Sequence, residues 1–149
     1  RLASPREFYT IARYTTPIFG LLSLGLIVSG AYLGLFQAPA DYQQGDSFRI
    51  IYVHVPAAWL SLMVYVIMAV AAAIGIIWRM KMAFVVAICS APLGAVFTAL
   101  ALITGSIWGK PIWGTWWTWD ARLTSELILL FLYFGVMATY HAFDDRKTA

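Results

Sequence analysis

Long apolar segments alternate with short polar ones along the whole chain. Each apolar segment has the roughly 20 residues that a helix needs to cross the hydrocarbon layer of a membrane. Four such spans are predicted, at about residues 14–36, 55–78, 83–107 and 121–140. The pattern therefore predicts an all-α integral membrane protein in which residues 1–149 form a single membrane domain.

Prolines and the polar N-terminal arm refine these boundaries. Proline is best tolerated in the first turn of a helix, so Pro56 predicts that the second span starts near Val55, after a surface segment at 48–54. A continuous helix with a kink at Pro56 is the alternative. Residues 1–13 are polar and basic, and they predict a short interfacial helix before the first span.

Tryptophan is concentrated between the third and fourth spans. Five of the seven tryptophans fall within twelve residues, at Trp108, Trp113, Trp116, Trp117 and Trp119. These tryptophans lie in a Trp-rich stretch that runs from Gly105 to Glu126, and Gly109, Pro111 and Gly114 predict that its first half is not a regular helix. A dense indole surface suits a flat, amphipathic ligand. An interfacial aromatic belt is the alternative, although its aromatics are usually more scattered.

Composition agrees with a membrane location. Hydrophobic residues make up 62% of the chain and charged residues 11%, and the mean hydropathy is +0.78, outside the range of soluble globular proteins. The single cysteine, Cys89, excludes an internal disulfide and is expected to be buried. Because the sequence starts without a methionine and stops just after a predicted span, we expect either that it is part of a longer protein or that its ends are disordered.

The placement of basic residues predicts the topology. Seven Lys and Arg residues lie in the N-terminal arm, the turn after the second span and the C-terminal tail: Arg1, Arg6, Arg13, Arg79, Lys81, Arg146 and Lys147. The other two loops hold three, Arg49, Lys110 and Arg122. The positive-inside rule therefore predicts cytoplasmic termini and places loops 37–54 and 108–120 on the outer face.

The two histidines fall at opposite membrane faces in this topology. His54 lies at the outer end of the second span, just before a predicted helix N-terminus. The helix dipole there disfavours an imidazolium and keeps the ring neutral and able to bind a metal. Since His54 shares the outer face with the tryptophans, we predict a metal ligand; a hydrogen-bonded interfacial residue is the alternative. His141, at the inner face, is expected to be solvated.

Charged residues near the tryptophans supply the remaining candidate chemistry. Asp120 is predicted to cap the fourth span. Arg122 and Glu126 are four residues apart, so they can pair on one helix face or serve a ligand. Lys110, Arg49 and above all Arg122 are the outward basic groups that can meet an anionic ligand; ordinary juxtamembrane charge is the alternative for each.

Several catalytic patterns are missing from the sequence. It has no Gly-rich phosphate loop, no Ser/His/Asp or Cys/His set on one face, no paired-carboxylate site and no basic patch interleaved with aromatics. We therefore expect a binding protein and not an enzyme, with no nucleic-acid partner.

The second half of the Trp-rich stretch resembles a known signature. Trp113-Gly-Thr-Trp-Trp-Thr-Trp-Asp-Ala-Arg-Leu-Thr-Ser125 is similar to the tryptophan-rich WWD motif of membrane proteins that handle haem in cytochrome c biogenesis. Its Asp-Ala-Arg-Leu-Thr-Ser continuation resembles that of the haem exporter protein C (CcmC) family. Ala38-Pro-Ala-Asp-Tyr-Gln-Gln-Gly45 and Ile51-Tyr-Val-His-Val-Pro-Ala-Ala-Trp59 agree, and the resemblance covers nearly the whole chain.

This resemblance implies a bacterial inner-membrane protein that binds haem b non-covalently and transiently at its periplasmic face. It implies presentation of the haem to the haem chaperone CcmE, alongside the ABC transporter subunits CcmA and CcmB and the small membrane protein CcmD. His54 is the implied axial ligand of the haem iron, and Arg122 can meet a propionate. The implied haem platform is Trp113, Trp116, Trp117, Trp119 and Asp120.

One departure from the family pattern affects the site. The family usually has six spans and a second axial histidine in a later outer loop, whereas His141 here matches an inner-face position. We therefore expect this chain to supply half of a bis-histidine site. Two other hypotheses remain: a non-haem structural subunit of an ABC-type transporter whose Trp-rich loop docks a periplasmic partner, and a small-molecule or proton carrier that uses Glu126 and Arg122.

Overall fold

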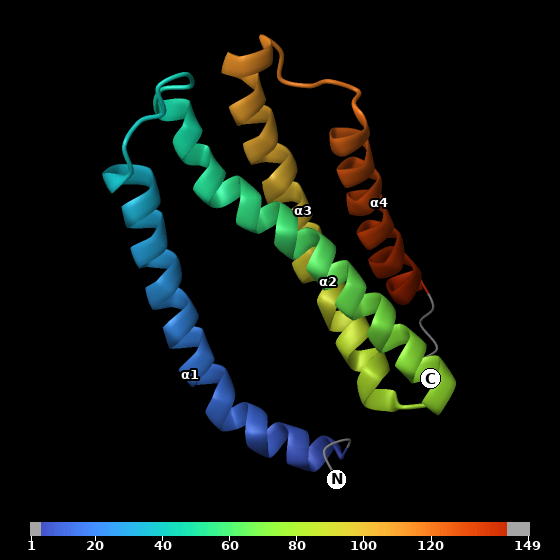
Figure 1. Ribbon diagram of the computed structural model, residues 1–149. Helices are drawn as coiled ribbons and strands as arrows, with labels where there is room; N and C mark the ends of the chain where they lie inside the picture. The colour runs from blue at the N-terminus through green and yellow to red at the C-terminus, as the bar shows by residue number, and fades with distance from the viewer. Residues whose placement is uncertain (1–3, 143–149) are drawn as a thin grey trace. The chain divides into compact units, whose positions relative to one another are not determined.

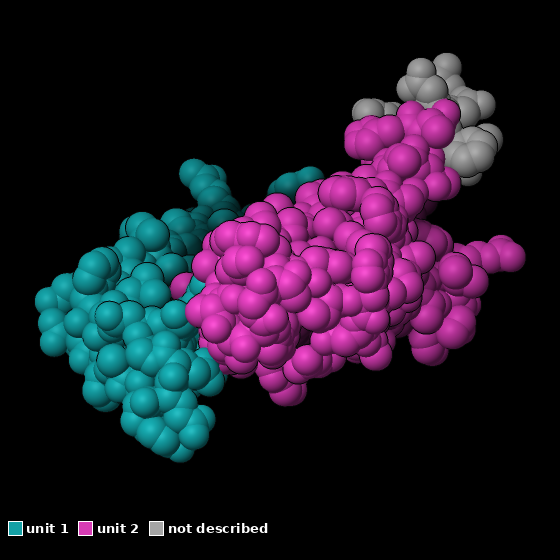
Figure 2. Space-filling view, turned by 90° about the horizontal axis from the view of Figure 1, so that it is seen from above, with its two compact units in different colours: residues 1–52 teal, residues 53–149 magenta. Residues whose placement is uncertain are grey.

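The computed structural model describes residues 4–142 and consists of four long helices joined by short loops (Figure 1). All four are long and apolar enough to cross a membrane, which confirms the all-α architecture with four spans. The basic residues at positions 1, 146 and 147 lie outside the described part. Contacts divide the chain into two compact units, Arg1–Tyr52 and Val53–Ala149, coloured separately in Figure 2.

The first unit is built on helix α1, Pro5–Tyr32, which continues as the π-helix η1, Leu33–Gln37. Pro5 stands at the first helical position, where its missing N–H costs no hydrogen bond. Residues 5–13 are therefore the first turns of α1, and the expectation of a separate interfacial helix is wrong.

A short 3₁₀ helix, η2 (Asp46–Ile50), follows the first loop, and Arg49 closes this region. The Arg49 guanidinium donates hydrogen bonds to the carbonyls of Ala38 at 3.1 Å and Leu35 at 3.3 Å. It also pairs with the Asp46 carboxylate at 3.4 Å. Arg49 is one of the basic residues that the sequence allows to meet an anionic ligand; in the structure its guanidinium instead binds loop carbonyls and Asp46.

The second unit contains most of helix α2 (Ile51–Trp78), together with α3 (Lys81–Trp113) and α4 (Ala121–Ala142). Helix α2 begins at Ile51 and is continuous through Pro56. The structure therefore agrees better with the alternative of one continuous helix than with a helix that starts near Val55. Helix α3 runs through Gly109 and Pro111 to Trp113. The prediction that the first half of the Trp-rich stretch is irregular is therefore wrong.

Gly114 ends α3. It has a left-handed backbone (φ 72°, ψ −2°), a conformation that costs glycine no side-chain clash. Its N–H donates to the Lys110 carbonyl at 3.0 Å, and the Lys110 ammonium donates back to the Gly114 carbonyl at 2.9 Å. The irregular part of the Trp-rich stretch is therefore only residues 114–120.

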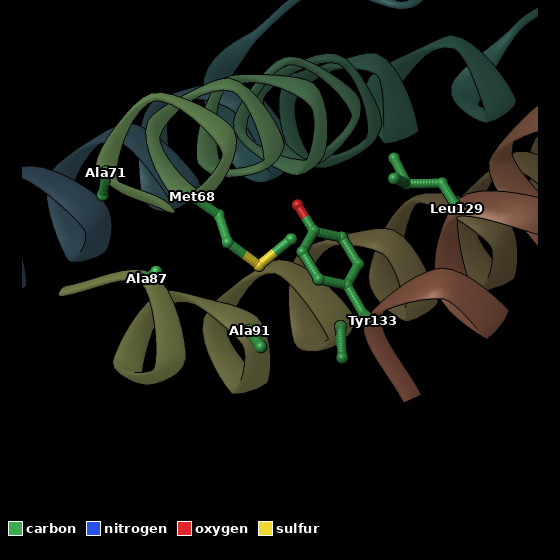
Figure 3. Packing of buried hydrophobic residues seen from close by; sticks show 7 residues of the cluster. Met68, Ala71, Ala87, Ala91, Leu129 and Tyr133 are labelled. Atoms are coloured by element: carbon green, nitrogen blue, oxygen red, sulfur yellow. The ribbon is translucent and has the colours of Figure 1, made fainter. Parts of the chain in front are cut away.

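Small residues on one face of α3 let α4 approach it closely. Its buried positions include Ala87, Ala91, Gly94, Ala95 and Thr98. Figure 3 shows Tyr133 of α4 reaching between α2 and α3, with Met68 of α2 beside it. Tyr133 is fully buried, and its hydroxyl donates to the Ser61 carbonyl of α2 at 2.7 Å.

Cys89 does not belong to this core. It lies on the exposed side of α3, so the expectation of a buried cysteine is wrong. An exposed apolar or weakly polar side chain on a spanning helix faces lipid or another membrane segment, and the chain exposes many large hydrophobic residues in the same way.

Candidate functional site

A cavity of about 330 Å³ lies in the second unit. It is at the end of the three helices where the Trp-rich stretch lies. Helix α2 contributes His54, α3 contributes Trp108 and Trp113, and α4 contributes Arg122 and Glu126. The remaining lining residues are small or apolar: Ala58, Ala101, Leu102, Gly105, Gly109 and Leu123. The cavity thus brings together one imidazole, two indoles, a guanidinium and a carboxyl group within apolar walls.

The His54 ring is held against α3 by hydrogen bonds at one nitrogen. Nδ1 lies 3.1 Å from the Ala101 carbonyl and 3.1 Å from the Thr104 hydroxyl oxygen. A carbonyl can only accept, so Nδ1 carries the hydrogen and the lone pair of the neutral ring resides on Nε2. Thr104 donates its own hydrogen to the Leu100 carbonyl at 2.7 Å, which leaves its oxygen free to accept. His54 therefore offers Nε2 as a ligand atom.

Two indoles from the last turns of α3 stand beside this imidazole and the Arg122 guanidinium. The Trp108 ring centroid lies 5.6 Å from that of His54, with the planes at 64°. The Arg122 guanidinium carbon lies 5.5 Å from the centroid of Trp113, within the range of a cation–π contact. Since α3 remains helical to Trp113, its backbone fixes both indoles on the cavity wall.

Glu126 and Arg122 each have a partner, but not each other. The Ser61 hydroxyl of α2 lies 2.6 Å from a Glu126 carboxyl oxygen. The Arg122 guanidinium donates to the Asp120 carboxylate at 2.9 Å. The spacing of Arg122 and Glu126 permits an ion pair between them, but in the structure the Asp120 carboxylate, two residues before the arginine, takes the guanidinium instead.

Asp120 caps α4, as its position predicts. Its carboxylate accepts the Leu123 backbone N–H at 2.9 Å, in addition to the Arg122 bond. The hydrogen bond from Leu123 and then the one from Arg122 favour the charged form and hold the pKa of Asp120 below its usual range. Asp120 is thus an ionised cap that joins the Trp-rich loop to α4.

The other predicted platform residues lie in the loop and do not line the cavity. Trp116 and Trp119 are 57% and 78% exposed, and the Lys110 ammonium lies 5.7 Å from the Trp116 ring centroid. Trp117 packs edge-to-face on Trp119, with centroids 5.4 Å apart. The Trp117 indole N–H is buried without a hydrogen-bond partner among the described residues. It is a donor that a ligand or water can satisfy.

The structure therefore divides the predicted site residues into two groups. The cavity brings together His54, Trp113 and Arg122, whereas the loop holds Trp116, Trp117, Trp119 and Asp120 apart from its lining. Sequence reasoning missed the site role of Trp108 and the supporting contacts of Ser61 and Thr104. Ser61 follows His54 by seven residues, two helical turns, and this spacing is the signal that places both on one face of α2.

The donor set indicates which kind of metal fits. Within residues 4–142, no group of three or more His, Cys, Asp or Glu side chains can hold a metal ion. An iron held by its own macrocycle needs only axial ligands from the protein. One imidazole beside two indoles and an arginine fits a metallated macrocycle with acidic substituents.

The comparisons with known proteins agree with this chemistry. The family model described as heme exporter protein C matches residues 1–149. Heme exporter protein C of Escherichia coli K12 is 58% identical over the whole chain, and the match covers 61% of that relative. The Haemophilus influenzae protein of the same name is 56% identical over 97% of the chain, covering 59% of the relative.

A more distant relative carries a name from cytochrome c biosynthesis. This ccmC-like mitochondrial protein of Marchantia polymorpha is 48% identical over 112 residues, which cover 75% of the chain and 49% of the relative. The chain thus spans about three fifths of the length of the bacterial relatives that it matches. The match over all 149 residues shows that the chain belongs to the heme exporter protein C family.

Proposed function

We propose that this chain binds haem b, non-covalently and transiently, at the periplasmic face of the bacterial inner membrane and takes part in cytochrome c biogenesis. The observation that carries the proposal is the cavity in which His54, with its lone pair on Nε2, meets the indoles of Trp108 and Trp113 and the Arg122 guanidinium. The names of the relatives support the same cargo.

Each group in the cavity has a use in this role. The neutral imidazole of His54 has its Nδ1 occupied by the Ala101 carbonyl, so Nε2 would be the atom that ligates the iron of a bound haem. The indole faces supply apolar contact area for a flat macrocycle, and Arg122 can pair with a propionate while it remains close to Asp120. The indoles of Trp116 and Trp119 are exposed in the loop between α3 and α4, and this apolar surface suits a cargo that must also leave.

The proposed task is binding and delivery, without catalysis. Following the family resemblance, haem passes to the chaperone CcmE, and CcmA, CcmB and CcmD are the membrane partners. A second axial ligand is expected from outside this chain, because the other histidine of the sequence, His141, ends α4 at the opposite end from Asp120 and the Trp-rich loop.

Haem titration of the purified full-length protein tests the proposal. We expect a Soret band with bound haem, and His54→Ala should weaken haem affinity by roughly tenfold or more, because an axial ligand is lost. His141→Ala is the matched control and should bind like the parent protein. Trp108→Leu and Trp113→Leu should each weaken binding without shifting the band as far as His54→Ala does.

The same purified protein distinguishes haem binding from the main alternative, a structural subunit that binds no haem. If the Trp-rich loop only docks a periplasmic protein, Trp116→Ala and Trp119→Ala will abolish capture of that partner while no variant, nor the parent, takes up haem. Failure of the full-length protein to bind haem would overturn the proposed function.

A further inference from the structure

Helix α3 carries a recess shaped for the His54 ring. Ala101, Thr104 and Gly105 follow the spacing i, i+3, i+4, so they share one helix face, and all three are buried. The imidazole from α2 lies on this face with Nδ1 directed at the Ala101 carbonyl and the Thr104 oxygen. Two acceptors and a residue without a side chain therefore meet one edge of the ring.

The Thr104 hydroxyl has backbone acceptors of its own on α3, so its oxygen is placed to accept from His54. Its single hydroxyl hydrogen bonds the Leu100 carbonyl at 2.7 Å, one turn back along α3. The oxygen that remains faces Nδ1 at 3.1 Å. The Ala101 carbonyl can only accept, so it requires hydrogen on Nδ1; the Thr104 oxygen, whose own hydrogen is directed at the backbone, favours the same tautomer.

Gly105 supplies the space for this contact. A methyl group at position 105 would lie 3.0 Å from Cε1 of His54 and 3.5 Å from Nδ1. Such a separation is closer than ordinary carbon–carbon contact, so the ring would move away from α3. Movement in that direction lengthens both hydrogen bonds at Nδ1.

We infer that Thr104 and Gly105 are positioning residues that fix the tautomer and orientation of His54 and thereby set its strength as an axial ligand. This inference rests on the proposed function, in which Nε2 ligates iron. A ligand histidine that donates its other N–H to an oxygen becomes more basic, and such outer partners commonly change metal affinity by 10–100-fold. A more basic ligand also favours ferric over ferrous iron.

Thr104→Val tests the role of the acceptor, since valine keeps the shape and removes the oxygen. In the full-length protein we expect haem affinity to fall roughly tenfold and the haem midpoint potential to rise. Thr104→Ser keeps the oxygen and should restore both values. Thr98→Val is the matched control on α3: Thr98 is buried, and its hydroxyl bonds the Gly94 carbonyl, away from His54.

Gly105→Ala tests the space for the ring in a separate way. We expect weaker haem binding and a raised midpoint potential, because the methyl group displaces the imidazole from its acceptors. Gly135→Ala on α4 is the control, since a methyl group there meets nothing within 4 Å. If Thr104→Val does not fold, Thr104→Ser and Gly105→Ala still test the inference.

A readout without haem completes the test. Nitrogen-15 NMR of histidine-labelled apoprotein should show the His54 signal, assigned by its loss in His54→Gln, as the Nδ1–H tautomer. Thr104→Val and Gly105→Ala should shift that signal toward a tautomer mixture, and Thr98→Val should not.

The outcomes distinguish the positioning role of Thr104 and Gly105 from the proposed haem binding by His54. If His54→Ala leaves the Soret band and haem affinity unchanged, the proposed function of His54 fails, whatever Thr104 does. If His54→Ala abolishes binding but Thr104→Val matches Thr98→Val in affinity, potential and tautomer, the proposed function stands and the positioning role is overturned.

Discussion

Asp120 connects the Trp-rich loop to α4 through three donors. Its carboxylate accepts from the Leu123 N–H and from Arg122, both at 2.9 Å, and from the Thr118 hydroxyl at 3.4 Å. The Arg122 side chain is 77% exposed, so solvent screens its charge and the ion pair adds little by itself. The cap is the more important contact, because it satisfies a backbone N–H at the start of a spanning helix.

This arrangement predicts how acid affects the loop. The folded-state pKa of Asp120 is depressed, so its charge stabilises the fold above the unfolded pKa of about 4, and this contribution is lost as the pH falls through the folded value. The Tm of the parent should therefore exceed that of Asp120→Asn at neutral pH, and the gap should close in acid. Thermal unfolding in detergent at several pH values measures it.

Asp120→Ala supplies the control for this experiment. Asparagine can still accept the Leu123 N–H, whereas alanine loses the cap as well as the charge, so the alanine variant should remain less stable than the parent even in acid. A gap between parent and Asp120→Asn that does not change with pH would contradict the predicted role of the charge.

The contacts of a single site residue could be predicted from the sequence only where its partner is close in sequence and has no competitor. The Asp120 cap follows from local spacing, and the structure bears it out. Arg122 has acidic residues on both sides, at positions 120 and 126, and spacing alone cannot decide between them. The acceptors of His54 lie 47 and 50 residues away on α3, so no local pattern predicts them.

At the scale of the helix, α3 contacts its neighbours through small residues and Tyr133 fills the space that they leave. The Tyr133 ring has no exposed surface, and a methyl group at Gly94 would overlap it. In lipid, where water does not drive helices together, such close packing and a few interhelical hydrogen bonds provide the association energy. The contact between Gly94 and Tyr133 is therefore a principal attachment of α4.

Gly94→Ala should destabilise the helical bundle. Overpacking of a close contact costs about 1–3 kcal/mol, because either the ring or the backbone must move. Gly135→Ala, on the open side of α4, should have little effect. Unfolding of the purified protein in mixed micelles measures the difference, and equal stabilities of the two variants would contradict the packing argument.

Tyr133→Phe is a smaller change at the same contact of α4. It keeps the ring and removes the hydrogen bond to the Ser61 carbonyl, so it should cost about 0.6 kcal/mol and at most ~1.7 kcal/mol, the range for polar contacts between membrane helices.

Helices could be predicted from the sequence more reliably than their ends. The four apolar segments reveal the four spans, because length and hydropathy determine what can cross a membrane. Proline misleads here: α2 and α3 continue through Pro56 and Pro111, since spanning helices tolerate a missing N–H when neighbours satisfy the backbone. Gly114 ends α3 through its left-handed conformation, which the sequence allows but does not require.

For the whole molecule, the helix order of the second unit places the cavity and the basic turn at opposite ends. His54 lies near the start of α2 and Trp113 ends α3, whereas Arg79 lies between the other ends of these two helices. The positive-inside rule predicts that the basic turn is cytoplasmic and the cavity periplasmic. Delivery of haem to a periplasmic protein requires this orientation.

Thiol labelling in cells tests the orientation in a background where Cys89 is replaced by alanine. Gln43→Cys in the first loop and Thr118→Cys in the Trp-rich loop should react with a reagent that does not cross the inner membrane, because both loops are predicted to face the periplasm. Met80→Cys, in the basic turn, should react only after the membrane is permeabilised. The two loops report on the two compact units independently, since Gln43 lies in one and Thr118 in the other. If Thr118→Cys is protected in intact cells while Met80→Cys is labelled, the orientation is the opposite of the predicted one. That result would rule out periplasmic delivery from this cavity.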